Sequence, residues 1–354
     1  MPTAPVLAPE LGAYVLPGRA SSPKLAVEQA VAGEQVGLGS VYLSERLGTK
    51  DLGTVGGAIA QATERVTITA AATHMQSRHP LALASLAITL QALSDERFVL
   101  GIGRSIPQVW KAHGLPPATN AVLVDGLGIL RRLWAGEEVS YDGPLGTFPS
   151  LYLKDRPDVA PPPVLLTAIG PQALKLAGEH FDGVLLHAFL TAEGHRRSAD
   201  AVRKAASDAG RDPGAVRLYG MVVVAADLPQ DEVDLRVRAR LVTYLNAPKL
   251  GESLVQANGW DARVLEAVAA HPLIAALEGR TADGALDGEQ LVEVSRVIPD
   301  EWFDEGAAVG THEQCAAVLR SLQAAGADEM IVHGSSPELL GPTVRAFAAT
   351  APGA

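Results

Sequence analysis

The 354-residue sequence contains few of the residue patterns that usually mark a reactive centre. Its nine histidines are scattered, with no His-x-His pair and no HExxH helix, so a metal site is not expected. The single cysteine, Cys315, cannot form an intramolecular disulfide or a thiolate metal cage. No G-x-S-x-G turn is present either. These features argue against metal-dependent hydrolysis and against hydrolysis by a nucleophilic serine or cysteine.

Two short glycine-containing segments are suited to binding a phosphate group. In Gly103-Arg104-Ser105 the small residues allow a ligand to approach the backbone, and the guanidinium of Arg104 can pair with a phosphate through two hydrogen bonds. In Ala168-Ile169-Gly170-Pro171 the proline can open a helix whose free N–H groups hold the same anion. The alternatives are a surface arginine paired with an acid and a tight turn that starts a helix. Together the two segments favour a large phosphorylated cofactor.

Alternating strand and helix patterns indicate how these segments are positioned. Each of eight apolar segments precedes an amphipathic helix pattern, and several are apolar on both faces, as in a buried parallel sheet. Gly101-Ile102-Gly103 lacks the third glycine of a G-x-G-x-x-G turn, which argues against a doubly wound fold. We therefore predict an α/β fold, a (β/α)8 TIM barrel that forms one domain over residues 1–354. Its strands are expected at 11–16, 40–44, 66–73, 97–102, 163–168, 183–187, 216–226 and 328–333.

Two segments are longer than a barrel crossover needs. The first, the Gly/Pro-rich stretch 136–162, follows the fourth strand, and the second, the largely helical block 229–300, follows the seventh strand. Both are predicted to be insertions. Reactive groups of such barrels lie at the carboxyl ends of the strands. Besides the two phosphate segments, this rule selects Pro17-Gly18, Ser44-Glu45-Arg46, Thr73-His74, His187 and Gly334-Ser335-Ser336.

The composition excludes several classes of partner. The net charge is −11, from 29 Lys and Arg against 40 Asp and Glu, and only 5% of the residues are aromatic. Such a chain repels phosphate backbones and offers few stacking platforms, so nucleic acid is not expected as a partner. No run of about 18 apolar residues and no secretory signal is visible, which predicts a cytoplasmic protein that does not enter a membrane. The helix pattern after Pro80 is apolar on most faces and predicts a homodimer, although packing against the barrel could absorb part of that surface.

Three motifs together carry a family resemblance. They are R-H-P at 78–80, R-F-V-L-G-I-G-R at 97–104 and G-P-Q-A-L-K-L-A-G at 170–178, and similar segments run in order through nearly the whole chain. With these motifs the sequence resembles the bacterial-luciferase-like monooxygenase superfamily of flavin- and deazaflavin-dependent barrel enzymes. More narrowly, it is similar to the actinobacterial oxidoreductases that use coenzyme F420, an 8-hydroxy-5-deazaflavin.

The resemblance implies a cofactor and a set of residues that bind it. The expected cofactor is coenzyme F420, with FMN as the alternative. A non-prolyl cis peptide between Ala71 and Ala72 would lie in a bulge behind the central ring, with Thr73 and Ser44 nearby. Arg104 and the backbone of residues 168–170 match phosphate-binding positions. The implied reaction is hydride transfer between the deazaflavin and an organic substrate such as a carbonyl, an alcohol or an activated alkene. An FMN-dependent monooxygenase and a cofactor-binding barrel without turnover are the alternatives.

The sequence departs from its relatives at the expected proton donor. Many relatives have a histidine after the second strand, where this chain has Glu45. Relatives that oxidise sugar phosphates have aspartate at the position of Ser44 and glutamate at that of Ile106, which argues against a glucose-6-phosphate dehydrogenase. Glu45 is the first catalytic candidate if burial raises its pKa; alternatively it is a solvated residue that forms an ion pair with Arg46 or Arg78.

The other two catalytic candidates are histidines. His74 follows the predicted bulge, and His187 ends the sixth predicted strand, so both could face the mouth of the barrel. For each, the alternative is a structural histidine whose ring nitrogens form hydrogen bonds with the backbone. A third histidine, His79, precedes Pro80 at a helix start and is predicted to be structural.

Overall fold

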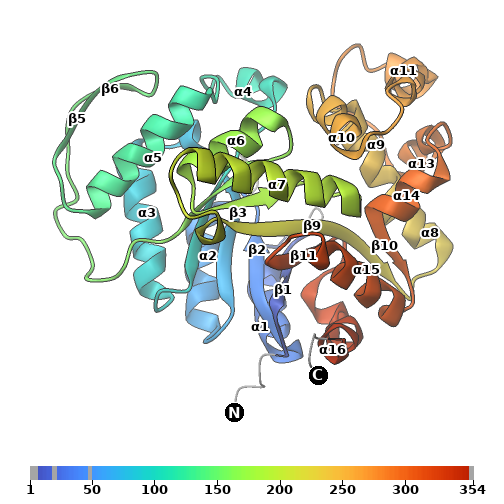
Figure 1. The fold of residues 1–354 in the computed structure, drawn as a ribbon, viewed down its shortest axis with the longest axis horizontal. Coiled ribbons are helices and arrows are strands. Elements are labelled where there is room, and N and C mark those ends of the chain that lie inside the picture. Colours follow the sequence, from blue (N-terminus) through green and yellow to red (C-terminus); the bar gives the residue numbers. More distant parts are fainter. Residues whose placement is uncertain (1–6, 18–21, 47–49, 351–354) are drawn as a thin grey trace.

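Residues 7–17, 22–46 and 50–350 are described by a computed structural model (Figure 1). Eight parallel strands pair in the order β9-β11-β1-β2-β3-β4-β7-β8, and β8 pairs with β9 to close the ring. The predicted (β/α)8 barrel is therefore confirmed. The eight strands are β1 (Ala8–Tyr14), β2 (Leu38–Leu43), β3 (Thr67–Thr73), β4 (Phe98–Ile102), β7 (Val164–Ala168), β8 (Gly183–Leu186), β9 (Arg217–Ala226) and β11 (Glu329–His333).

Helices between the strands cover the outside of the barrel. Their limits follow local chemistry: Gly37, at a φ of 94°, ends α1, and the His79 side chain caps α3 by accepting a hydrogen bond from the Leu81 N–H at 3.2 Å. The structural role predicted for His79 is thereby confirmed. The barrel helices are α1 (Lys24–Val36), α2 (Leu52–Ala62), α3 (Pro80–Leu93), α5 (Asn120–Trp134), α6 (Pro171–His180), α7 (Ala192–Asp208), α15 (His312–Ala324) and α16 (Gly341–Ala349).

The excursion after β4 is more regular than its sequence indicates. It begins with α4 (Pro107–Ala112), and after α5 it forms an antiparallel hairpin of β5 (Val139–Gly143) and β6 (Gly146–Leu151). The hairpin was not predicted, because most of its side chains are exposed and its sequence has no clear alternation of apolar residues. Stacking of Tyr141 on Phe148, at 6.1 Å between ring centroids, joins the two strands.

The insertion after β9 is built from short helices. Figure 1 shows α9, α10 and α11 together on one side of the molecule, far from the β5–β6 hairpin. A π-helical segment, Asp234–Arg238, joins α8 to α9. A ninth strand, β10, was not predicted; it extends the sheet beside β9. The inserted elements are α8 (Gln230–Val233), α9 (Ala239–Asn246), α10 (Leu250–Asn258), α11 (Arg263–Ala270), α12 (Pro272–Ala275), α13 (Gly288–Ser295), α14 (Asp300–Gly306) and β10 (Ala307–Gly310).

Helix α3, the basis of the dimer prediction, buries most of its apolar residues within the chain. It packs against α2 and α5, and Leu83, Ala87 and Ile88 are fully buried there. The exposed stripe is formed by Ala82, Ser85, Thr89 and Leu93. Packing against the barrel therefore accounts for more of the apolar surface than the sequence indicates. Within the described residues, no helix is both long and apolar enough to span a membrane.

One buried histidine should make stability depend on pH. His195 of α7 is 1% exposed, and neither of its ring nitrogens has a hydrogen-bond partner among the described residues. Burial lowers its pKa from 6.5 to about 4, so the folded protein holds the neutral imidazole while the unfolded chain takes up a proton below about pH 6.5. Between pH 6.5 and about 4, this residue should therefore lower the free energy of unfolding by about 1.4 kcal/mol per pH unit of acidification.

The variant His195→Leu separates this effect from other titrating groups. Denaturant unfolding at pH 7 and pH 5 should show a loss of stability on acidification that is about 2 kcal/mol smaller in His195→Leu than in the wild type. Equal losses in the two proteins would mean that His195 is already protonated, or hydrated, in the folded state.

Candidate active site at the mouth of the barrel

The centre of the site is a bulge in β3. The peptide bond between Ala71 and Ala72 is cis, as the family resemblance implies, and the register of β3 against β4 shifts between Ala70 and Thr73. The Tyr14 hydroxyl, from β1, donates a hydrogen bond of 3.1 Å to the Ala71 carbonyl oxygen inside the barrel. The bulge thus has small side chains and a buried partner for its carbonyl.

The bulge requires a glycine on the neighbouring strand. A Cβ atom at Gly101 of β4 would overlap the carbonyl oxygen of Ala70. Gly101→Ala should therefore lower the free energy of unfolding by about 1–3 kcal/mol, the usual cost of overpacking. Gly128→Ala is the matched control, because a Cβ on that exposed position of α5 meets no atom within 4 Å and an alanine there favours the helix. Denaturant unfolding measures both changes, and an undiminished stability of Gly101→Ala would contradict the close approach.

The first phosphate segment lies directly beside the bulge. A Cβ on Gly103 would approach the Thr167 hydroxyl to 3.1 Å and the Ala72 methyl to 3.3 Å. The half-buried Arg104 side chain donates 2.7 and 2.5 Å hydrogen bonds to the carbonyl of Ala118 and the side-chain oxygen of Asn120. No carboxylate in the described part of the chain lies within ion-pair distance of it, and burial lowers its pKa. Ser105 follows in a left-handed conformation, with φ at 56°. Among the residues that the structure describes, Arg104 therefore lacks the acid partner that the alternative interpretation requires.

The second phosphate segment opens α6. Pro171, the first helical residue, has no N–H, no side chain caps the preceding Gly170, and the Ala173 N–H donates to the Gly170 carbonyl oxygen at 3.0 Å. Within the described residues, the Gln172 N–H is therefore the first-turn donor left for an anion. Ala168, buried, ends β7, and the half-buried Ile169 follows it. The Ser253 hydroxyl of α10 lies 3.5 Å from the position of a Cβ on Gly170, so the insertion reaches this loop. An arginine without an acid and an uncapped helix beside small residues fit a phosphorylated cofactor.

Glu45 forms an ion pair with Arg78, one of the two partners that the alternative interpretation offers, but the pair is buried and not solvated as that interpretation predicts. Its two carboxylate oxygens lie 2.6 and 2.5 Å from the two Nη atoms of Arg78, and the Thr73 hydroxyl donates to it as well. The second of those Nη atoms also binds the Asp51 carboxylate at 3.1 Å. Half-buried Ser44 precedes Glu45. The carboxylate is thus oriented by two neighbours, and a proton-donor role would require it to act from within this ion pair.

The two histidine candidates lie in different surroundings. His74 is near Glu45 and Arg78; its Nδ1 is buried without a hydrogen-bond partner among the described residues, and burial lowers its pKa. His187, at the end of β8, has Nδ1 3.1 Å from the Ala188 carbonyl, and burial lowers its pKa to about 4. Both imidazoles are therefore neutral at neutral pH, and no hydrogen bond or ring contact between them is seen.

Several residues at the mouth were not predicted to belong to the site. His187 makes an edge contact with Tyr244 of α9, at 4.6 Å between ring centroids, and Tyr14 contacts His333 at 5.1 Å. His333 ends β11, one residue before the strand-end segment Gly334-Ser335-Ser336 that is selected from the sequence. Tyr244 lies in the insertion, where no strand end gives a signal, and Tyr14 lies inside a strand.

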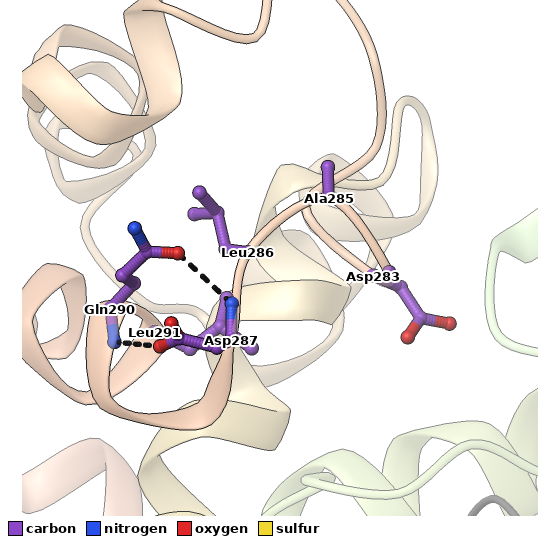
Figure 2. A pocket seen from close by; sticks show the side chains of 7 residues that line it. Asp283, Ala285, Leu286, Asp287, Gln290 and Leu291 are labelled. Atoms are coloured by element: carbon purple, nitrogen blue, oxygen red, sulfur yellow. Dashed lines mark hydrogen bonds between the residues drawn. The ribbon is translucent and has the colours of Figure 1, made fainter.

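The insertion also contains an open hollow lined by residues 283–287, 290 and 291 (Figure 2). The Asp287 and Gln290 side chains form a capping box with each other's backbone at the start of α13. Figure 2 shows Asp283 pointing away from this pair. Because these polar groups serve the helix start, the hollow has no feature of a reactive centre.

Comparisons with known proteins agree with this geometry. Residues 5–329 match the family model described as luciferase-like monooxygenase. The chain is 26% identical over 310 residues, covering 85% of it and 87% of the relative, to a 5,10-methylenetetrahydromethanopterin reductase of Methanolobus tindarius. It is 32% identical over 177 residues to an F420-dependent glucose-6-phosphate dehydrogenase of Beutenbergia cavernae; that match covers 46% of this chain and only 52%, about half, of the relative.

A solved structure supports the fold across the whole chain. The coenzyme F420-dependent tetrahydromethanopterin reductase of Methanopyrus kandleri superposes with a TM-score of 0.78 at 18% identity, covering 98% of both chains. At that identity the likeness shows the barrel architecture alone. The family model extends over most of the chain, and its match spans the barrel from β1 through β9 and reaches the first residue of β11. The chain therefore belongs to the luciferase-like monooxygenase family.

Proposed function

We propose that this protein is an oxidoreductase that binds coenzyme F420 and transfers hydride between it and an organic substrate. The observation that carries the proposal is the half-buried Arg104, which has no acid partner among the described residues and lies beside the alanine bulge. The name of the Beutenbergia relative, which is F420-dependent, supports the cofactor, and the name of the Methanolobus relative, a reductase, supports the class of reaction. Substrates of those relatives are not carried over to this chain.

The side chains at the mouth suit distinct parts of such a reaction. When bound, a deazaflavin supplies or accepts two electrons as hydride at its ring. Arg104 and the first turn of α6 would hold the phosphate, and Ala71 and Ala72 leave room for a flat ring against the backbone. His74 and His187 are neutral at neutral pH, so either imidazole can act as a base that takes up the proton of a substrate hydroxyl when an alcohol is oxidised.

An FMN-dependent monooxygenase is the second candidate function. The observation that favours it is the family itself, whose description is that of a monooxygenase. Arg104 and the α6 N-terminus suit the phosphate of FMN equally well. That reaction needs reduced flavin, dioxygen and exclusion of water, whereas hydride transfer from a deazaflavin needs no oxygen.

Isotope transfer tests the proposal. Reduced F420 carrying deuterium at its reactive ring carbon is incubated without oxygen with a panel of ketones, aldehydes and activated alkenes. We expect deuterium at the reduced carbon of a product, because hydride passes directly from ring to substrate. Oxygenated product formed only with reduced FMN and dioxygen would overturn the proposal in favour of the second function.

We also propose that the protein forms a homodimer. The exposed stripe of α3, made of Ala82, Ser85, Thr89 and Leu93, carries no charged residue, and depletion of charge is typical of the core of an interface. Sedimentation at micromolar concentration should give the mass of two chains. A monomer under these conditions would remove this proposal.

A further inference from the structure

The insertion after β9 places an arginine and a tyrosine over the ends of barrel strands. Tyr244 of α9 contacts the His187 ring at 4.6 Å and the Phe189 ring at 5.8 Å, both just beyond β8. Arg240 lies one turn earlier on α9, with its guanidinium carbon 6.0 Å from the centroid of the Tyr244 ring. Helix α9 therefore forms one wall of the barrel mouth.

A second wall, at the end of β11, contains a buried imidazole with an unused nitrogen, and β9 alone separates β11 from β8. His333 is 8% exposed, its ring is 5.1 Å from that of Tyr14, and its Nδ1 has no hydrogen-bond partner among the described residues. Burial lowers the pKa of His333 well below its ordinary value, and the positive charges of Arg240 and Arg46 lower it further. Both cations therefore lie close enough to His333 to act on its ring electrostatically. A buried polar atom without a partner is uncommon, and a ligand atom can satisfy it.

Arg240 differs from the other arginines of its segment. Arg236 and Arg238 pair with Glu232 at 2.9 Å and with Asp300 at 2.7 Å. For the half-buried Arg240, the described part of the chain offers no carboxylate within ion-pair distance. Lys50, also half-buried, likewise has none, and burial together with the charge of Arg46 lowers its pKa to about 8. Cations withdrawn from water without a counter-charge are costly, so this side of the mouth favours an anion.

We propose that Tyr14, His187, Arg240, Tyr244 and His333 together form a recess that binds an anionic group of the substrate, a carboxylate or a phosphate. Arg240 is its main cation, because the planar guanidinium presents two parallel N–H groups to either anion. The aromatic rings cover the organic part of the molecule, and Nδ1 of His333 meets one of its polar atoms. The inference rests on the proposed function, since it names the class of substrate that meets the cofactor there.

Calorimetric titration with orthophosphate and with oxalate tests the recess without turnover. We expect saturable binding of at least one of these anions by the wild type and a tenfold or greater loss of affinity in Arg240→Gln. Arg240→Lys should retain part of the affinity, and Arg196→Gln, which removes an exposed arginine of α7 paired only with Glu193, should retain all of it. Thermal unfolding of each variant shows that the fold is kept. Equal affinity in Arg240→Gln and the wild type, or no saturable binding, would overturn the inference.

A second arm distinguishes this recess from the cofactor site. Binding that is lost in Arg104→Gln but kept in Arg240→Gln would place the anion at the cofactor phosphate position and overturn the inference. In turnover, the wild type should have a lower KM for a 2-oxo acid than for its methyl ester. In Arg240→Gln the KM for the 2-oxo acid should rise, so that this difference disappears. If F420 fails to support hydride transfer while Arg240-dependent anion binding persists, the proposed function is wrong and the recess stands as an anion site.

Discussion

Replacing Arg78 with methionine should destabilise the protein by about 3–5 kcal/mol, the largest effect expected from any single change considered. The Arg78 side chain is 15% exposed and that of Glu45 only 4% exposed, and the two form a two-pronged ion pair. Without the guanidinium, the Glu45 carboxylate stays buried with the Thr73 hydroxyl as its remaining side-chain hydrogen-bond donor. Denaturant unfolding of Arg78→Met against the wild type gives the change directly.

Two further variants test whether burial of the ion pair causes the large loss of stability in Arg78→Met. Arg132→Met breaks an ion pair with Glu137 in which both side chains are about half exposed, and it should cost less than about 1 kcal/mol. The double variant Glu45→Gln/Arg78→Met should recover part of the stability lost in Arg78→Met, because no buried charge is left unpaired. A loss in Arg78→Met as small as that in Arg132→Met would show that the pair is open to water.

Glu45→Gln alone decides between the two roles of that residue. Glutamine keeps the shape but cannot transfer a proton. If Glu45 is a proton donor, the variant retains cofactor affinity and loses most of its turnover. If Glu45 only anchors the loop after β2 through Arg78, turnover stays and the proton moves through His74 or His187.

Arg104→Gln should weaken binding of the cofactor by about 10- to 100-fold. The substitution removes the charge that would meet the phosphate while glutamine can still reach the Ala118 carbonyl, and one charge-assisted contact is worth about 1.5–3 kcal/mol. A fluorescence titration of the purified variant measures the affinity. The matched control is Arg196→Gln, which changes the net charge equally at an exposed ion pair on α7. Unchanged affinity in Arg104→Gln would place the phosphate elsewhere.

The barrel was predictable because its signal is local and repeated. Each strand is a short apolar run between polar turns, and every predicted strand overlaps the observed one, with ends that differ by three residues or fewer. The cis bond at Ala71–Ala72 followed from the family resemblance, since composition alone does not distinguish it from any other alanine pair. Features that depend on a few adjacent residues, such as the His79 cap, were likewise visible in the sequence.

The parts that were missed depend on contacts between distant segments. Tyr14 belongs to the site because its hydroxyl reaches the carbonyl of Ala71, 57 residues away in the chain. Arg240 and Tyr244 belong to it because the insertion folds back over β8, which no periodicity within 229–300 reveals. For Glu45 the sequence left a choice among partners, and only the fold selects Arg78 over Arg46 as its two-pronged partner.

Equilibrium titration of the purified protein with F420 and with FMN, both in oxidised form, tests the central claim most directly. We expect saturable binding of F420 that is tighter than that of FMN and is weakened in Arg104→Gln. Saturable binding of FMN with none of F420 would contradict it and identify the barrel as a flavin enzyme.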